Sequence, residues 1–189
     1  MERINTLLFA LINASASPNS LVLSFARAAA VGGVYAVAIV PVILWLGGPA
    51  KRRGAVVAAL IGVAVAMTIN FLITSLWFHP RPFMVGAGNT FLSHAPETSF
   101  PSDHVTLVVG LGLGLIATRA SALGGILVTA AGLIIGWARV YLGVHWPFDV
   151  FGSVAVAVIA AGFAKLVGVG LGARAILTWD RLTHKRGAA

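Results

Sequence analysis

Five long apolar segments, with most of the charged residues in the stretches between them, determine which folds are open to this sequence. They cover residues 21–46, 54–78, 102–118, 122–142 and 148–172. A helix needs about 20 apolar residues to cross the hydrocarbon core of a bilayer. The runs are continuous rather than alternating, which argues against a membrane β-barrel. The pattern therefore predicts an all-α integral membrane protein, a bundle of about five transmembrane helices.

The composition agrees with this interpretation. Of 189 residues, 59% are hydrophobic and 10% charged, and the mean hydropathy is +0.97, outside the range of soluble domains. Five spans use most of the length, so we expect one membrane-embedded domain over residues 1–189. The absence of cysteine excludes disulfides and thiolate metal ligands. The net charge of +8 is not gathered on one face, so no nucleic-acid partner is expected, and no oligomeric state follows.

The Lys and Arg residues are distributed unequally between the two ends of the expected bundle. Eight of the 13 lie in the 47–54 loop, the 119–121 turn and the 174–189 tail, and Lys165 lies close to them, so this end has nine. Cytoplasmic segments of membrane proteins carry an excess of Lys and Arg. We therefore expect this end, with a cytoplasmic tail at 174–189, to face the cytoplasm. Its basic residues are Lys51, Arg52, Arg53, Arg119, Lys165, Arg174, Arg181, Lys185 and Arg186.

The first 20 residues have two interpretations. The stretch "TLLFALINASA" resembles a signal-peptide core with a small-residue cleavage site, but "MERIN" before it has no net positive charge. Five apolar residues recur at helical spacing, which favours an interfacial helix over residues 1–20. Whether the segment is cleaved stays open. The five residues are Ile4, Leu7, Leu8, Leu11 and Ile12.

Polar side chains cluster where the expected helices emerge at the end opposite the basic loops. Ionisable groups near a bilayer are costly and normally mark a functional site. Their arrival from several separate helix ends at one depth predicts that they converge. The residues are Arg81, Ser102, His104, Arg139, His145 and Asp149.

The residue types in this cluster favour a phosphate ligand. Two guanidinium groups can bind phosphoryl oxygens, and a helix beginning at Pro101 and Ser102 would direct free N–H groups toward an anion. Of two histidines, one can attack phosphorus while the other protonates the leaving oxygen. A carboxylate four residues after His145 can fix the tautomer of that imidazole.

Each residue also has a simpler interpretation. Arg81 could anchor at lipid headgroups, and Ser102 could be an ordinary N-cap. His145 beside a tryptophan could belong to an interfacial aromatic belt. Asp149 could be a first-turn carboxylate favoured by the helix dipole.

A metal site is the remaining alternative for these side chains. His104, His145 and Asp149 could be ligands, with His79 and His94 in reserve. Two arginines beside a dication would repel it, and the compact H-x-x-x-H spacing is absent. We therefore expect neither a metal nor a cofactor.

Three motifs give the chain a family resemblance. "TSLWFHPRP" (74–82), "PSDH" (101–104) and "ARVYLGVHWPFD" (138–149) resemble the K-x6-R-P, P-S-G-H and S-R-x5-H-x3-D motifs of the type 2 phosphatidate phosphatase superfamily, which is related to the vanadium haloperoxidases. The resemblance covers a core of about residues 70–150. It implies that His145 is a nucleophile forming a phosphohistidine, that Asp149 orients it and that His104 is the general acid. It also implies that Arg81, Ser102 and Arg139 hold the phosphate.

Three positions depart from the superfamily pattern. Thr74 replaces Lys, Asp103 replaces Gly and Ala138 replaces Ser. Asp103 joins the expected substrate-binding residues but makes the pocket less positive, and His79 or His94 could compensate. The segments "SFPSDH", "GVHWPFDV" and "LFALIN" are most similar to those of the bacterial undecaprenyl pyrophosphate phosphatases associated with bacitracin resistance, in which these departures are familiar.

The resemblance implies a metal-independent enzyme. It would hydrolyse undecaprenyl diphosphate, a polyprenyl diphosphate lipid, to undecaprenyl phosphate and phosphate at the outer face of the bacterial cytoplasmic (inner) membrane, recycling the lipid carrier for cell-wall synthesis. The loop at 79–102 would cover the site. The alternatives are a broader phosphatase acting on phosphatidate or phosphatidylglycerol phosphate, phosphotransfer to another lipid, and a non-catalytic lipid-binding or transport protein.

Overall fold

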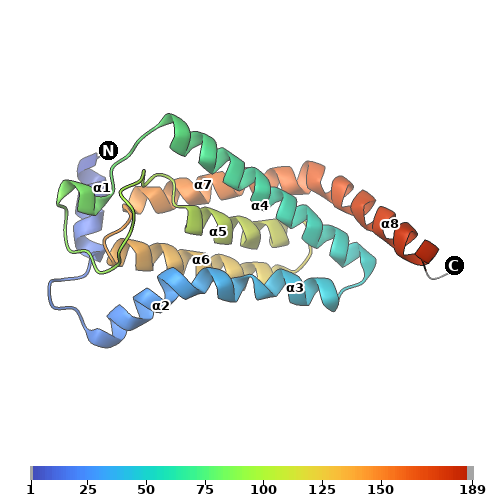
Figure 1. The fold of residues 1–189 in the computed structure, drawn as a ribbon, viewed down its shortest axis with the longest axis horizontal. Coiled ribbons are helices and arrows are strands. Elements are labelled where there is room, and N and C mark those ends of the chain that lie inside the picture. The colour runs from blue at the N-terminus through green and yellow to red at the C-terminus, as the bar shows by residue number, and fades with distance from the viewer. Residues whose placement is uncertain (1, 187–189) are drawn as a thin grey trace.

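The protein is a bundle of long helices with a loop-rich end, as Figure 1 shows. The structure, a computed structural model, describes residues 2–186, with side chains to residue 182. No strand occurs in this part of the chain, which confirms the all-α prediction. The helices are α1 (Glu2–Ile12), α2 (Ser20–Val37), α3 (Ile39–Leu46), α4 (Ala50–Leu76), α5 (Asp103–Ala117), α6 (Ala122–Tyr141), α7 (Pro147–Phe163) and α8 (Val169–Arg186), with a 3-10 turn η1 (Pro82–Val85) and a π-helical turn η2 (Ala164–Gly168).

Four helical stretches are long and apolar enough to span a membrane. They are Ser20–Leu46, Ala50–Leu76, Ala122–Tyr141 and Pro147–Leu182. The first is broken at Ala38, between α2 and α3. Pro41 has no N–H with which to bond the carbonyl of Val37, so the break lies where the helical ladder is already interrupted.

The third expected span, residues 102–118, corresponds to α5, which has 15 residues and therefore a length of only about 22 Å. Most of its residues are buried, because it lies at the centre of the bundle against α4, α6 and α7. The packing on α6 is close. A Cβ added at Gly112 would lie 2.6 Å from the Thr129 nitrogen and 2.8 Å from the Gly125 carbonyl oxygen. A helix surrounded by protein in this way does not need the length of one that meets lipid.

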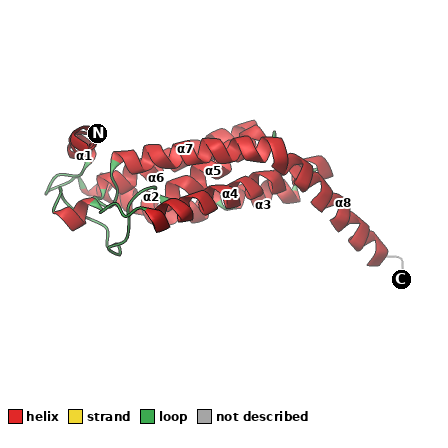
Figure 2. Ribbon diagram, turned by 90° about the horizontal axis from the view of Figure 1, so that it is seen from above, coloured by secondary structure: helices red, strands yellow, loops and turns green. Residues whose placement is uncertain are grey.

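The last span is longer than the sequence pattern predicts. Helix continues from α7 through η2 into α8, so the expected tail at 174–189 is helical as far as Arg186. The side chains of Lys185 and Arg186, and residues 187–189, lie outside the described part. Gly172 packs directly on Gly54 of α4, where a Cβ would overlap the Gly54 carbonyl oxygen, so α8 stays in contact with α4 past the expected end of the span. Figure 2 shows α8 leaving the bundle at an angle.

Helix α1 lies across the loop-rich end of the bundle (Figure 1). The Phe9 ring packs 5.0 Å from the Trp146 ring, and Asn5 Oδ1 accepts from the Phe148 N–H at 3.0 Å. Leu7 and Leu11 are 57% and 83% exposed, so apolar side chains point away from the bundle. The predicted N-terminal helix is present but ends at Ile12, and the chain is irregular until Asn19 caps α2, so the interfacial position stays a prediction.

Candidate active site

The site is built around a turn and the loop that covers it. Gly143, with φ of 80°, lies in the turn between α6 and α7, and a Cβ there would overlap the carbonyl oxygen of Asn89. Asn89 is itself fixed, because its N–H donates to Asn13 Oδ1 at 2.8 Å and its side chain donates to the Ala14 carbonyl at 3.0 Å. The loop after α4 is therefore held against the turn that carries His145.

His145 and Asp149 form the centre of the site. The imidazole Nδ1 is 3.1 Å from Asp149 Oδ2, and the same oxygen accepts the Trp146 N–H at 2.8 Å. His145 is 2% exposed and Asp149 is fully buried. The Trp146 indole donates to the Pro80 carbonyl at 2.8 Å, which ties the turn to the covering loop. The carboxylate is therefore positioned from two directions.

Arg81 determines which nitrogen of His145 carries the proton. Its Nη1 lies 3.0 Å from His145 Nε2, and a guanidinium can only donate. Nε2 must therefore be the acceptor, which leaves the proton on Nδ1, where Asp149 accepts it. Burial lowers the pKa of His145 to about 3, so the ring is neutral near pH 7. The Nε2 lone pair is thus available for nucleophilic attack.

Backbone carbonyls fix the guanidinium of Arg81. Nε donates to Glu97 at 3.1 Å, Nη1 to Val144 at 2.9 Å and Nη2 to Thr98 at 3.0 Å. Arg81 is 5% exposed, and burial lowers its pKa despite the opposing charges of Asp149, Glu97 and Asp103. A buried arginine held this way is a fixed part of the site rather than a headgroup anchor.

Two predicted phosphate-binding groups are buried without a partner. Ser102 Oγ and Arg139 Nε make no hydrogen bond to any described residue. Arg139 Nη1 approaches the Ala30 carbonyl only at 3.5 Å. Buried polar atoms are almost always paired in folded proteins. Unpaired donors beside a histidine and a second arginine are therefore suited to an anionic ligand.

Ser102 occupies the N-cap position of α5, but its hydroxyl does not cap the helix. Ser153 of α7 fixes the backbone instead, accepting the Ser102 N–H at 2.8 Å and donating toward the Ser102 carbonyl at 3.0 Å. The ordinary N-cap interpretation is therefore wrong for this side chain.

The first turn of α5 holds His104 and Asp103. His104 is half-buried and lies within electrostatic range of Arg139, His94 and Arg81. Asp103 Oδ1 accepts a short hydrogen bond from the amide of Asn70 in α4, and Asn70 in turn accepts from Thr106 at 3.1 Å.

Asn70 therefore restrains the extra negative charge of Asp103, a role the sequence analysis missed. Asn70 is completely buried. An amide isolated within the apolar run of α4 was the available signal, because polar groups inside spans seldom lack a function.

Both spare histidines lie beside the His145–Asp149 pair. His79 Nδ1 is 2.8 Å from Ser99 Oγ and 3.6 Å from Asp149 Oδ1, which is too long for a hydrogen bond. The His94 ring lies edge-on to His145 at 6.3 Å, and burial lowers its pKa, so it does not replace the missing lysine charge. The hydroxyl of Thr74 bonds the Phe71 carbonyl in its own helix.

No ligand cluster in the described residues supports the metal alternative. Within residues 2–186, no group of three or more His, Asp and Glu side chains is arranged to hold a metal ion. Metal-independent chemistry stays a prediction.

Comparison with known proteins gives consistent matches. Residues 55–171 match the sequence model of the PAP2 superfamily. The chain is 34% identical over 185 residues to the putative undecaprenyl-diphosphatase YbjG of Escherichia coli (strain K12), covering 98% of this chain and 87% of that protein. It is 37% identical over 127 residues to the undecaprenyl-diphosphatase BcrC of Bacillus subtilis (strain 168), covering 67% of this chain and 64% of that protein.

Two solved structures share the fold. LpxE of Aquifex aeolicus superposes with a TM-score of 0.70 at 22% identity, covering 85% of this chain and 94% of that one. A PAP2-type phosphatidylglycerolphosphate phosphatase from Bacillus subtilis superposes with a TM-score of 0.64 at 15% identity, covering 87% of this chain and 84% of that one. These similarities establish the arrangement of the helices.

Proposed function

The chain belongs to the PAP2 superfamily, and on that premise we propose that it is an undecaprenyl-diphosphatase. It would hydrolyse undecaprenyl diphosphate to undecaprenyl phosphate and inorganic phosphate. The names of its curated relatives support the substrate. The observation that carries the chemistry is His145, neutral with its Nδ1 proton on Asp149 and its Nε2 beside Arg81.

In the first step, His145 Nε2 attacks the terminal phosphorus. The new N–P bond forms as the bond from phosphorus to the bridging oxygen breaks, and undecaprenyl phosphate leaves with that oxygen and its electron pair. His104 supplies a proton to the leaving oxygen. The imidazole gains positive charge, which the buried Asp149 carboxylate stabilises.

In the second step, water attacks the phosphohistidine. His104, now neutral, accepts a proton from this water as the P–N bond breaks, and inorganic phosphate is released. This return of the proton restores both histidines to their starting states. The same groups therefore serve as acid and then as base.

The phosphoryl oxygens need donors that are already in place. Ser102 Oγ and Arg139 Nε are buried without partners, and the Arg81 Nη1 proton that Nε2 accepts in the free site is left for a phosphoryl oxygen when Nε2 bonds phosphorus. Fixed donors of this kind stabilise developing negative charge without reorganising during the reaction.

A diphosphate substrate is compatible with the two residues of the pocket, Thr74 and Asp103, that depart from the superfamily pattern. The departing lipid monophosphate is a far weaker base than the alkoxide left by a simple monoester. It therefore demands less of the general acid and of the positive charge. A pocket with Thr74 in place of Lys, and with Asp103 near both arginines, fits the easier leaving group.

The location of the site suits a lipid substrate. The turn between α6 and α7, which carries His145, lies at the loop-rich end, opposite the start of α4 and the α5–α6 turn, which carry basic residues (Figure 1). With the basic end in the cytoplasm, the site faces the outer surface of a bacterial inner membrane, where undecaprenyl diphosphate needs recycling for cell-wall synthesis. The lipid tail stays in the bilayer while the diphosphate enters from the side. Such an activity would confer bacitracin resistance.

A substrate panel tests the proposal. Phosphate release by the purified protein is measured in one detergent from undecaprenyl diphosphate, phosphatidate and phosphatidylglycerol phosphate, with His145→Ala as the blank and with and without a chelator. We expect kcat/KM for the diphosphate to be at least about tenfold higher, roughly 1.4 kcal/mol at the transition state, and chelator to have no effect. Equal or reversed preference would favour a broader lipid phosphatase. No turnover of any substrate would favour a non-catalytic lipid-binding protein.

A further inference from the structure

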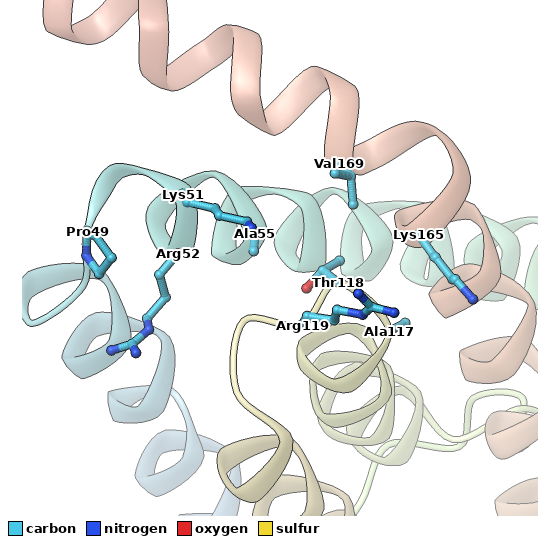
Figure 3. Close-up of a pocket in the computed structure, with 9 residues that line it drawn as sticks. All are labelled: Pro49, Lys51, Arg52, Ala55, Ala117, Thr118, Arg119, Lys165 and Val169. Atoms are coloured by element: carbon cyan, nitrogen blue, oxygen red, sulfur yellow. The ribbon is translucent and has the colours of Figure 1, made fainter.

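A cavity lined by cationic residues lies at the opposite end of the bundle from His145. Its volume is about 500 Å³, and Figure 3 shows the side chains around it. Four cationic residues line it, from the start of α4, the turn after α5 and the η2 turn. None of its lining residues is acidic. The complete lining is Pro49, Lys51, Arg52, Ala55, Ala117, Thr118, Arg119, Lys165 and Val169.

The four cationic side chains do not stabilise the fold through polar contacts with other described residues. All are exposed, and none forms an ion pair or side-chain hydrogen bond with another described residue. Helix α4 begins here at Pro49 without a side-chain cap, so the free N–H groups of its first turn add to the positive potential. Like charges gathered around one hollow repel each other unless an anion lies between them. The cavity therefore favours an anionic ligand.

An apolar cavity of about 420 Å³ adjoins the basic one and shares Lys51, Ala55, Thr118 and Val169 with it. Its remaining wall comes from the α4 start and from α8. Apart from Lys51, Thr118 and Asp180 its lining is apolar or glycine. The two hollows together form a cleft that is cationic at one end and apolar at the other. The residues lining the second cavity only are Ala50, Gly54, Ala173, Ile176, Leu177 and Asp180.

The length of the last helix puts this cleft near the membrane surface. The stretch Pro147–Leu182 has 36 residues and is therefore about 54 Å long, against a hydrocarbon core of about 30 Å. Its second half must reach the interface. There Leu177, Trp179 and Leu182 are exposed on a helix that also carries Arg174 and Arg181, a composition typical of interfacial helices.

From these observations we infer that the cleft between α4 and α8 binds one anionic membrane phospholipid. The phosphate of the headgroup lies among Lys51, Arg119 and Lys165, and an acyl chain lies along Ile176 and Leu177. A free phosphate would use the cations but leave the adjoining apolar hollow unfilled, which is why we commit to a lipid. The expected leaflet is the cytoplasmic one, whose surface is rich in anionic lipid. This site is separate from the proposed catalysis.

Lipid retention in native mass spectrometry tests the inference. The purified protein is incubated in neutral detergent with phosphatidylglycerol or with phosphatidylcholine of the same acyl chains. We expect at least about tenfold tighter retention of phosphatidylglycerol. Inorganic phosphate at millimolar excess should not displace it. A phosphodiester headgroup has no terminal phosphoryl group to transfer, and His145→Ala should retain the lipid equally, which separates this site from the catalytic one.

The matched variants remove charge without removing the cavity wall. Lys51→Gln, Lys165→Gln and Arg119→Asn are combined, with Asn chosen because φ at position 119 is 61° and Asn tolerates that conformation. Each Lys or Arg near an anionic headgroup contributes measurably, so we expect at least about tenfold weaker retention. Arg174→Gln, the control for the single Lys165→Gln variant, removes one positive charge from an exposed position outside both cavities and should change little.

Three results would overturn the inference. They are equal retention of the two lipids by the wild type, unchanged retention by the combined variant, and displacement by inorganic phosphate. Should the combined variant fail to fold, the wild-type lipid comparison and the single Lys165→Gln variant still decide the matter. Failure of these measurements leaves phosphate release at His145 untouched.

Discussion

Replacing Asp149 by Asn separates two contributions of its carboxylate, its charge and its control of the His145 tautomer. Asp149 Oδ2 accepts from both His145 Nδ1 and the Trp146 N–H, at 3.1 Å and 2.8 Å. Because the Trp146 donor is a fixed backbone group, an Asn side chain should place its oxygen, not its NH₂, at this point. His145 would then keep its Nδ1 proton and its free Nε2. The variant should lose only the charge.

The loss of the Asp149 carboxylate charge determines how far kcat/KM should decrease. A hydrogen bond to an ionised group contributes about 1.5–3 kcal/mol, against about 1 kcal/mol for a neutral one. During phosphoryl transfer the imidazole becomes cationic, and a charge about 4 Å away at an effective dielectric of about 20 contributes at most about 4 kcal/mol. A loss of about 2–4 kcal/mol corresponds to a decrease of roughly 30- to 900-fold in kcat/KM.

The assay compares Asp149→Asn with Asp149→Ala and His145→Ala in phosphate release from one prenyl diphosphate. Asp149→Ala removes the acceptor of both N–H groups and should be slower than the Asn variant. His145→Ala should show no turnover. A shift to the wrong tautomer costs about 10⁴-fold in a comparable His–Asp pair.

Two outcomes would refute this reasoning. An Asn variant within about threefold of wild type would mean that the carboxylate charge does not assist phosphoryl transfer. An Asn variant as inactive as His145→Ala would mean that the Trp146 N–H does not control the orientation of the amide.

Further predictions concern the acid, the pH dependence, a buried amide and the topology. His104→Ala should reduce kcat/KM more for phosphatidate than for a prenyl diphosphate, because the poorer leaving group needs the proton more, and equal losses would contradict a general acid. Because burial holds the pKa of His145 at about 3, below its ordinary 6.5, the ring stays neutral at pH 5, and the single-turnover phosphoenzyme burst should persist there rather than vanish with a midpoint near 6.5. The same lowered pKa means that this group's contribution to stability is present above pH 6.5 and declines as the pH falls toward 3, which thermal unfolding of wild type and His145→Gln can compare. Asn70→Ala should destabilise the protein by about 1–3 kcal/mol, because the buried Thr106 hydroxyl loses its acceptor, and Thr106→Val in that background should recover part of the loss; no recovery would contradict the coupling. A reporter after Arg186 should read cytoplasmic and one at residues 86–90 external, and reversed signals would move the chemistry to the cytoplasm.

Sequence patterns predicted the spans and the grouping of the site because both depend on strong local signals. Apolar runs mark α4 and α6, and costly ionisable groups mark Arg81, Arg139 and His145. The helical character of α1 followed from its amphipathic spacing. These features are encoded within a few neighbouring residues.

The remaining features depend on contacts between distant segments. Arg81 is fixed by the carbonyls of Glu97, Thr98 and Val144, and a carbonyl leaves no trace in the sequence. Asn70 meets Asp103 only once α4 and α5 pack together. The close packing of Gly172 on Gly54 likewise joins two helices that are distant in the sequence.

Because α5 is enclosed by other helices, it is easily missed as a span, and this changes whether the number of membrane crossings is even or odd. Hydropathy and length identify four spans in the described residues, an even number that would return both termini to the same side. With α5 the number becomes odd, and N and C lie at opposite ends of the bundle, as Figure 1 shows. One enclosed helix of 15 residues thus decides which side of the membrane every later segment occupies.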